Sequence, residues 1–131
     1  MRAVDTNVLV RALVRDDAEQ ATRAQALLTE AEVYVPVTVM LELEWVLRSR
    51  YGYGPKLVAQ VLGKLTALGN VIVGEHQAVV AAAARVAQGW DFADALHHVL
   101  SEGYEDFATF DTDLVRRAGR GAKVVPPVRR I

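Results

Sequence analysis

Cysteine is absent from this chain of 131 residues, which excludes disulfide bonds and thiolate metal ligands. Histidine is scarce, with only His76, His97 and His98, so a zinc site is disfavoured. No apolar run approaches the roughly 20 residues that a membrane-spanning helix needs. The N-terminal segment becomes charged by Asp5, so we expect no signal peptide and a cytoplasmic protein.

A strong net charge is also missing, because the formal charge at pH 7 is −1. Basic residues nevertheless gather in short clusters, which are suited to phosphate contacts, although any single cluster is more typical of a solvated helix face or end. Hydrophobic residues make up 52% of the chain, enough for one core with apolar surface left over for a subunit contact. We therefore expect a single domain over residues 1–131.

Short apolar runs alternate with segments of helical period along the whole chain. Strands are expected at residues 2–4, 32–35, 70–73, 107–110 and 123–125. Helices are expected at residues 7–14, from 17, at 38–50, from 55 to near 69, at 78–87, from 91 to about 102 and from about 113. This alternation predicts an α/β fold, a three-layer α/β/α sandwich with a central, mainly parallel sheet of about five short strands.

Four carboxylates lie where these elements succeed one another, namely Asp5, Glu42, Asp94 and Asp111. Ligands of an open parallel sheet bind beyond the carboxyl ends of its strands, so we expect the four to converge on one edge. Like charges about 4 Å apart repel by about 4 kcal/mol per pair at an effective dielectric near 20. A divalent cation such as Mg²⁺ or Mn²⁺, which prefers oxygen ligands, would relieve that repulsion and could activate water for phosphate chemistry.

Simpler structural roles exist for each acid taken singly. Helix capping accounts for the acids near helix starts, which are Asp5, Asp91, Asp94, Asp111 and Asp113. Glu42 is equally compatible with a solvated helix position, and Glu44 competes with it for a functional role. Because the two glutamates are two residues apart on a helix, they point in different directions. The functional hypothesis rests on the set rather than on any member.

Four segments resemble the PIN-domain ribonucleases, and within these the VapC toxins of bacterial toxin–antitoxin pairs. They are residues 4–11 (VDTNVLVR), 41–47 (LELEWVL), 91–96 (DFADAL) and 109–111 (TFD). The resemblance implies the same compact α/β/α sandwich and an endoribonuclease that depends on Mg²⁺ or Mn²⁺. It also implies a homodimer and neutralisation by a small VapB-like antitoxin.

Residue roles follow from the resemblance by position. Asp5 and Asp94 are the implied principal metal ligands, and Glu42 and Asp111 the remaining catalytic acids, with Asp113 as an alternative to Asp111. The implied supporting polar positions are Thr6, Asn7 and Thr109. In the implied mechanism, a metal-bound water attacks the scissile phosphorus and the metal stabilises charge on the phosphate oxygens.

Partner surfaces are predicted from leftover basic and bulky residues. The candidate RNA contacts are Arg11, Arg15, Arg48, Arg50, Arg116 and Arg117. Trp45, Leu47, Tyr51 and Tyr53 provide more bulk than a small core needs, so they line a dimer contact or an antitoxin groove unless they simply pack the core. An antitoxin arginine would pair well with the clustered carboxylates.

Three other classes are alternatives to the nuclease hypothesis. The segment around Asp5 is similar to the strand-end aspartate of haloacid-dehalogenase-type phosphatases, but that family needs a second aspartate where Asn7 stands. A receiver-type signalling domain needs acidic residues at spacings that do not fit. A non-catalytic α/β binding module predicts no metal-dependent RNA cleavage at all.

Overall fold

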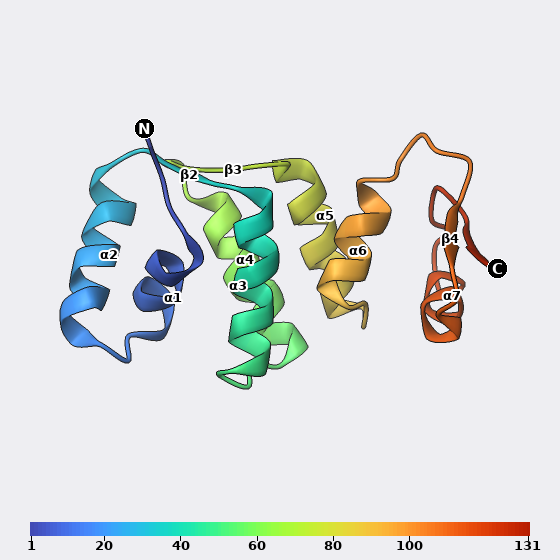
Figure 1. Ribbon diagram of the computed structural model, residues 1–131, viewed down its shortest axis with the longest axis horizontal. Coiled ribbons are helices and arrows are strands. Elements are labelled where there is room, and N and C mark those ends of the chain that lie inside the picture. The colour runs from blue at the N-terminus through green and yellow to red at the C-terminus, as the bar shows by residue number, and fades with distance from the viewer.

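Seven helices and five short strands alternate in the computed structural model, which describes residues 1–131 (Figure 1). The strands are β1 (Arg2–Ala3), β2 (Val33–Val35), β3 (Val71–Val73), β4 (Phe107–Thr109) and β5 (Val128–Arg130). The helices are α1 (Thr6–Val14), α2 (Ala18–Glu30), α3 (Val37–Ser49), α4 (Pro55–Ala67), α5 (His76–Ala87), α6 (Phe92–Val99) and α7 (Thr112–Ala118). No helix combines the length and the apolar character needed to cross a membrane.

Aspartate side chains begin several of these helices by accepting hydrogen bonds from backbone N–H groups that lack a partner within the helix. The Asp17 carboxylate accepts from the Gln20 N–H at 3.0 Å, so the predicted start of α2 is confirmed. Asp5 accepts from the Val8 N–H at 3.2 Å, and Asp91 from the Asp94 N–H at 3.1 Å. Asp5 and Asp91 therefore have their carboxylates fixed in a cap, and Asp94 has its backbone N–H fixed in one.

All strand pairings are parallel, so the predicted α/β fold with a mainly parallel sheet is confirmed. The five strands form two sheets rather than one: β1, β2 and β3 pair in that order, and β4 pairs with β5 alone. Helices α5 and α6 lie between the three-stranded sheet and β4 (Figure 1). The apolar pattern marks the first four strands correctly but carries no information on which strands are neighbours, because pairing is decided by long-range packing.

The last strand was expected at residues 123–125, and that prediction is wrong. The pairing segment is Val128–Arg130, beyond Pro126 and Pro127, and the Phe107 N–H donates to the Pro127 carbonyl at 2.9 Å just before the ladder begins. Val124 and Val125 have high strand propensity but lie in the irregular segment before β5, with a bend at Val125 and Pro126. Pairing with β4 therefore outweighs local propensity.

The two faces of the three-stranded sheet differ in burial. Val33, Val35, Val71 and Val73 point into a core of 26 buried apolar residues. On the opposite face, Tyr34 of β2 lies beside Ile72 of β3, and these two side chains are 37% and 47% exposed. One face of the sheet is thus packed against helices, while the other carries adjacent apolar side chains in contact with solvent.

A buried histidine ties the C-terminal unit (β4, α7 and β5) to the rest of the molecule. His98 is fully buried, and its Nδ1 lies 2.7 Å from the Arg85 guanidinium. Because arginine can only donate, Nδ1 accepts, and Nε2–H donates to the Pro126 carbonyl at 2.7 Å. The ring also packs edge-on against Phe107, with centroids 5.7 Å apart. His98 is therefore held as the neutral tautomer.

Protonation of His98 should loosen this attachment. Burial lowers the pKa of His98 below its ordinary value, and the charge of Arg85 adds to this, although the bond to Pro126 opposes it. A lowered pKa in the folded state gives stability that is present above about pH 6.5 and is lost as pH falls through the folded-state pKa.

We expect His98→Leu to lower the free energy of unfolding by about 2–4 kcal/mol, because it leaves the Pro126 carbonyl and the Arg85 guanidinium without a partner. Urea unfolding at pH 7.5 and 5.5 measures this, and the variant should lose part of the acid sensitivity of the wild type. The matched control is His97→Gln, which changes an exposed histidine on the same helix. Equal stability of His98→Leu and wild type would contradict the proposed attachment.

Candidate metal site

Asp5 and Glu42 form the first of two acidic pairs. Asp5 follows β1 as the N-cap of α1, and Glu42 lies one turn into α3. Thr6 joins them, since its hydroxyl donates to Glu42 Oε1. The first acidic cavity, of about 270 Å³, is lined by Asp5, Thr6, Asn7, Glu42, Trp45, Val46 and Arg50. The predicted supporting positions Thr6 and Asn7 therefore lie beside the first pair.

Asp94 and Asp111 form the second pair. Asp94 lies in the first turn of α6, and Asp111 is the N-cap of α7, where it accepts from the N–H groups of Asp113 (2.9 Å) and Leu114 (3.1 Å). The Asp111 N–H donates to the Thr109 hydroxyl at 3.0 Å, so this third predicted supporting residue also touches its acid. The second acidic cavity, of about 160 Å³, is lined by Trp90, Asp91, Asp94, Asp111, Asp113, Leu114 and Arg117.

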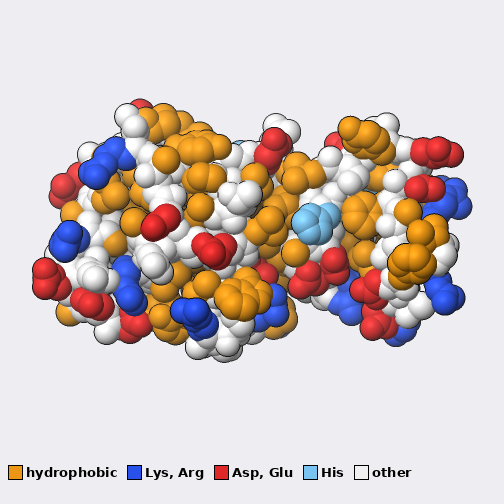
Figure 2. All heavy atoms as spheres, in the orientation of Figure 1, with side chains coloured by type: hydrophobic (Ala, Val, Ile, Leu, Met, Phe, Trp, Pro, Cys, Tyr) orange, Lys and Arg blue, Asp and Glu red, His pale blue; other side chains and the backbone are white.

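The expectation that all four carboxylates share one edge is not met. No group of three or more acidic or histidine side chains is spaced to hold a single metal ion. The physical reason is the strand pairing, because β4 lies beside β5 and not beside β1, so their carboxyl ends do not form a common edge. Acidic side chains gather in separate groups on one face, on either side of a furrow (Figure 2).

Electrostatic strain is greatest at Asp94. Burial raises the pKa of Asp94, the charges of Asp91 and Asp111 raise it further, and His97 opposes them. The ionised form of Asp94 is thus disfavoured in the protein alone and would be favoured by a bound cation. Both cavities offer carboxylate oxygens and no sulfur, a donor set that suits Mg²⁺ or Mn²⁺.

Asp91 lines the second acidic cavity, although the sequence analysis treated this residue only as a helix cap. It does cap α6, but it also lies in the cavity with Asp94 and raises the pKa of that residue. Its spacing three residues before Asp94 was the available signal. A capping acid at that spacing is common in helices, so the signal could not be separated from ordinary capping.

Glu44, the competitor of Glu42, has a structural role. Its side chain is buried and accepts from Arg48 Nε at 2.9 Å, and Arg48 also lies 3.9 Å from Asp91 Oδ1. This bridge joins α3 to the start of α6. Glu42, by contrast, is exposed and faces the first acidic cavity. Glu44 thus serves a structural contact, and Glu42 is the glutamate of α3 that lines the first acidic cavity.

The six arginines predicted to contact RNA differ in their surroundings. Three of them are paired with acids: Arg48 with Glu44, Arg11 with Asp16 at 3.0 Å, and Arg116 with Asp113 at 2.6 Å. Arg15 is exposed at the end of α1. Arg50 lines the first acidic cavity and Arg117 the second. Arg50 and Arg117 are thus the two placed beside the candidate metal ligands.

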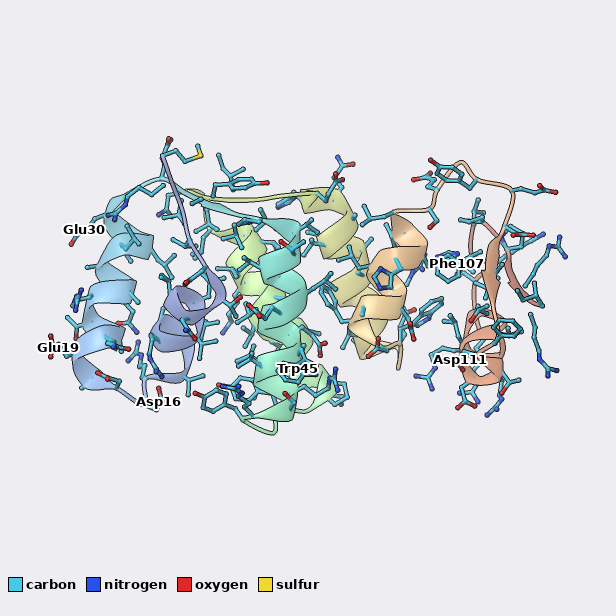
Figure 3. All side chains as sticks on the ribbon, viewed as in Figure 1. Asp16, Glu19, Glu30, Trp45, Phe107 and Asp111 are labelled. Carbon is cyan, nitrogen blue, oxygen red and sulfur yellow. The ribbon has the colours of Figure 1, made fainter.

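Of the four bulky residues, only Trp45 provides substantial exposed surface. Leu47 is fully buried in the core, so core packing is the correct interpretation for it. Tyr51 and Tyr53 are half-buried against the core, and the Tyr51 hydroxyl donates to Asp16 at 3.0 Å. Trp45 is 51% exposed, lies on the outer side of α3 and lines the first acidic cavity (Figure 3).

We expect Asp94→Asn to stabilise the metal-free protein at pH 7 by less than about 1 kcal/mol, as is typical of partly exposed charges. A raised pKa means that ionisation of Asp94 costs stability once the pH exceeds its folded-state pKa, and asparagine avoids this cost. The same variant should lose the stabilisation that added Mg²⁺ or Mn²⁺ gives to the wild type. Thermal unfolding in chelator and in metal measures both effects.

The control for this variant is Asp113→Asn, which removes an exposed acid that is paired with Arg116. It should not stabilise the metal-free protein. Loss of stability in metal-free Asp94→Asn would show that the ionised Asp94 carboxylate is not under strain.

Comparison with known proteins adds one match. The family model for the PIN domain matches residues 2–120, a span that includes both acidic cavities. A search among curated proteins found no match.

Proposed function

This chain belongs to the PIN domain family, and on that premise we propose that it is an endoribonuclease, the toxin of a VapBC-type toxin–antitoxin pair. PIN domains are in general metal-dependent nucleases that bind RNA. The observation that carries the proposal is the pairing of acids within the matched residues, Asp5 with Glu42 and Asp94 with Asp111. We propose further that residues 1–131 form one PIN domain that acts in the cytoplasm.

Asp5 and Asp94 would be the principal ligands of Mg²⁺ or Mn²⁺, supported by Glu42 and Asp111, with Asp113 as the alternative to Asp111. Magnesium in proteins is commonly held by one or two carboxylates while it keeps several waters, so each pair can hold a cation by itself. When bound, the metal supplies an activated water and stabilises charge on the phosphodiester.

The neighbouring side chains prepare these acids and receive the phosphate. Thr6 fixes one oxygen of Glu42, and the Thr109 hydroxyl accepts from the Asp111 N–H, so both acids are oriented before metal arrives. Arg50 and Arg117 place a positive charge in the first and second acidic cavities. A guanidinium there can neutralise a non-bridging phosphate oxygen of RNA.

Asp5→Asn and Asp94→Asn should each lower metal-dependent RNA cleavage by at least about 100-fold, a loss typical of removing one charge-stabilising group. Asparagine keeps helix capping possible at Asp5, so the fold should be retained. Cleavage of a labelled RNA is measured with Mg²⁺, Mn²⁺ or chelator, and Glu30→Gln, an exposed acid at the end of α2, is the control. Full activity in either variant would remove that residue from the mechanism, and a metal-inert wild type would favour a non-catalytic module.

A homodimer and a VapB-like antitoxin are the proposed protein partners. The accessible surface is 7887 Å², whereas a compact monomer of this mass exposes about 6,800 Å². Surface is therefore available for burial, including the apolar sheet face formed by Tyr34 and Ile72. An antitoxin arginine entering the first acidic cavity would meet Asp5 and Glu42 and would lie near the Trp45 ring.

Sedimentation at micromolar concentration should show a dimer for the wild type. Tyr34→Lys should shift it toward monomer, because an ammonium group would enter an apolar contact. Leu57→Lys, which changes an exposed apolar residue of α4, is the control and should leave the dimer intact. A monomeric wild type at this concentration counts against the dimer.

A further inference from the structure

A cavity of about 360 Å³ lies between β1, α1 and α2. It is lined by Arg2, Asn7, Val8, Arg11, Gln20, Arg23, Ala24 and Leu27. Three of these residues are arginines and none is acidic, in a chain whose net charge is −1. We name it the arginine cavity, and its charge is suited to an anion.

Two of the three guanidinium groups are available to a ligand. Arg2 is exposed and forms no ion pair, and the nearest acid to Arg23 is Glu19 at 3.9 Å with both side chains largely exposed. An ion pair this exposed contributes little to stability, so it holds Arg23 only weakly. Glu19 lies on the outer side of α2, away from α1 (Figure 3). Arg11 is held by Asp16 and by Gln20 Oε1, at 3.0 and 2.6 Å, and so forms a fixed wall.

The arginine cavity adjoins the first acidic cavity through Asn7, which lines both. The order along this face is therefore arginines, Asn7, and then Asp5 with Glu42. A phosphodiester placed at the acids would direct the next nucleotide of the same strand past Asn7 toward the arginines. The apolar lining of Val8, Ala24 and Leu27 would meet the sugar and base, in a volume within the usual range for small-molecule pockets.

We propose that the arginine cavity binds the nucleotide that flanks the scissile phosphate of a single-stranded RNA, with its phosphate on Arg2 and Arg23. This inference rests on the proposed nuclease function and specifies its substrate subsite. Because both arginines hold the same phosphate, both contribute to RNA binding and neither takes part in the cleavage reaction. KM and RNA affinity should therefore depend on the arginine cavity, whereas kcat should not.

The test is the double variant Arg2→Gln/Arg23→Gln, assayed with oligoribonucleotides shortened one nucleotide at a time from each end. With the full-length substrate, KM should rise about tenfold and kcat should stay within about twofold. In the wild type, nucleotides at one end of the substrate should lower KM, and the double variant should lose this effect. Nucleotides at the other end should affect KM equally in the wild type and in the variant. The slope of log binding constant against log salt should become less steep by about 0.7, the value for one phosphate of a single strand.

Binding is also measured without cleavage, in chelator and in an Asp5→Asn background, with a fluorescent single-stranded RNA. If the wild type does not cleave RNA but the double variant still loses binding here, the nuclease proposal fails and the subsite stands. Arg2→Lys/Arg23→Lys keeps both charges and should retain most of the binding. Lys56→Gln/Lys64→Gln removes two exposed charges from α4 and should change neither KM nor the salt slope.

Four outcomes would overturn the proposal. The first is an unchanged KM and salt slope in Arg2→Gln/Arg23→Gln, and the second is an equal effect of the α4 control. The third is competition by inorganic phosphate as effective as that by RNA at equal ionic strength, which would identify a free-anion site. A loss of antitoxin binding without any change in RNA binding would instead make this a protein-docking site and would also refute the subsite.

Discussion

The parallel pairing of β4 with β5 separates the candidate ligand Asp111 from Asp5 and Glu42, which lie beside the three-stranded sheet. It carries Thr109, Asp111 and Asp113 on a C-terminal unit that does not join the three-stranded sheet. That unit is held to the rest of the molecule by the hydrogen bond from His98 to the Pro126 carbonyl and by the contact of His98 with Phe107. Two acidic cavities, each with its own arginine, are the consequence.

Capping and metal binding need not be competing roles for these acids. Asp5, Asp91 and Asp111 each begin a helix, and each lines an acidic cavity. A cap holds the carboxylate by a backbone N–H and so fixes its orientation. One carboxylate oxygen can serve the cap while the second faces the cavity. Asp94 lacks such a side-chain cap, and it is the acid whose pKa is raised by burial and by its neighbours.

Much of the secondary structure follows from local sequence. The starts of α2 at Asp17 and α6 at Asp91, and the strands around Val33, Val71 and Phe107, agree with the sequence analysis because caps and apolar runs act over a few residues. The position of the last strand and the division into two sheets could not be predicted in this way, because both depend on strand partners that lie far apart in the sequence. Val124 and Val125 show this, since their propensity alone favours a strand that packing does not form.

The same distinction applies to the candidate site. The identity of the acids and of Thr6, Asn7 and Thr109 could be inferred from motifs, since each motif lies within a few consecutive residues. The arginine cavity could not, because Arg2 belongs to a strand and Arg23 to the middle of α2, with no motif linking them. A net charge of −1 also hides it, since acids elsewhere on the chain cancel the arginines in the sum. At physiological ionic strength charges are screened over about 8 Å, so a nucleotide responds to the groups nearest to it and not to that sum. A nearly neutral domain can therefore present an acidic cavity and an arginine cavity that are both lined by Asn7.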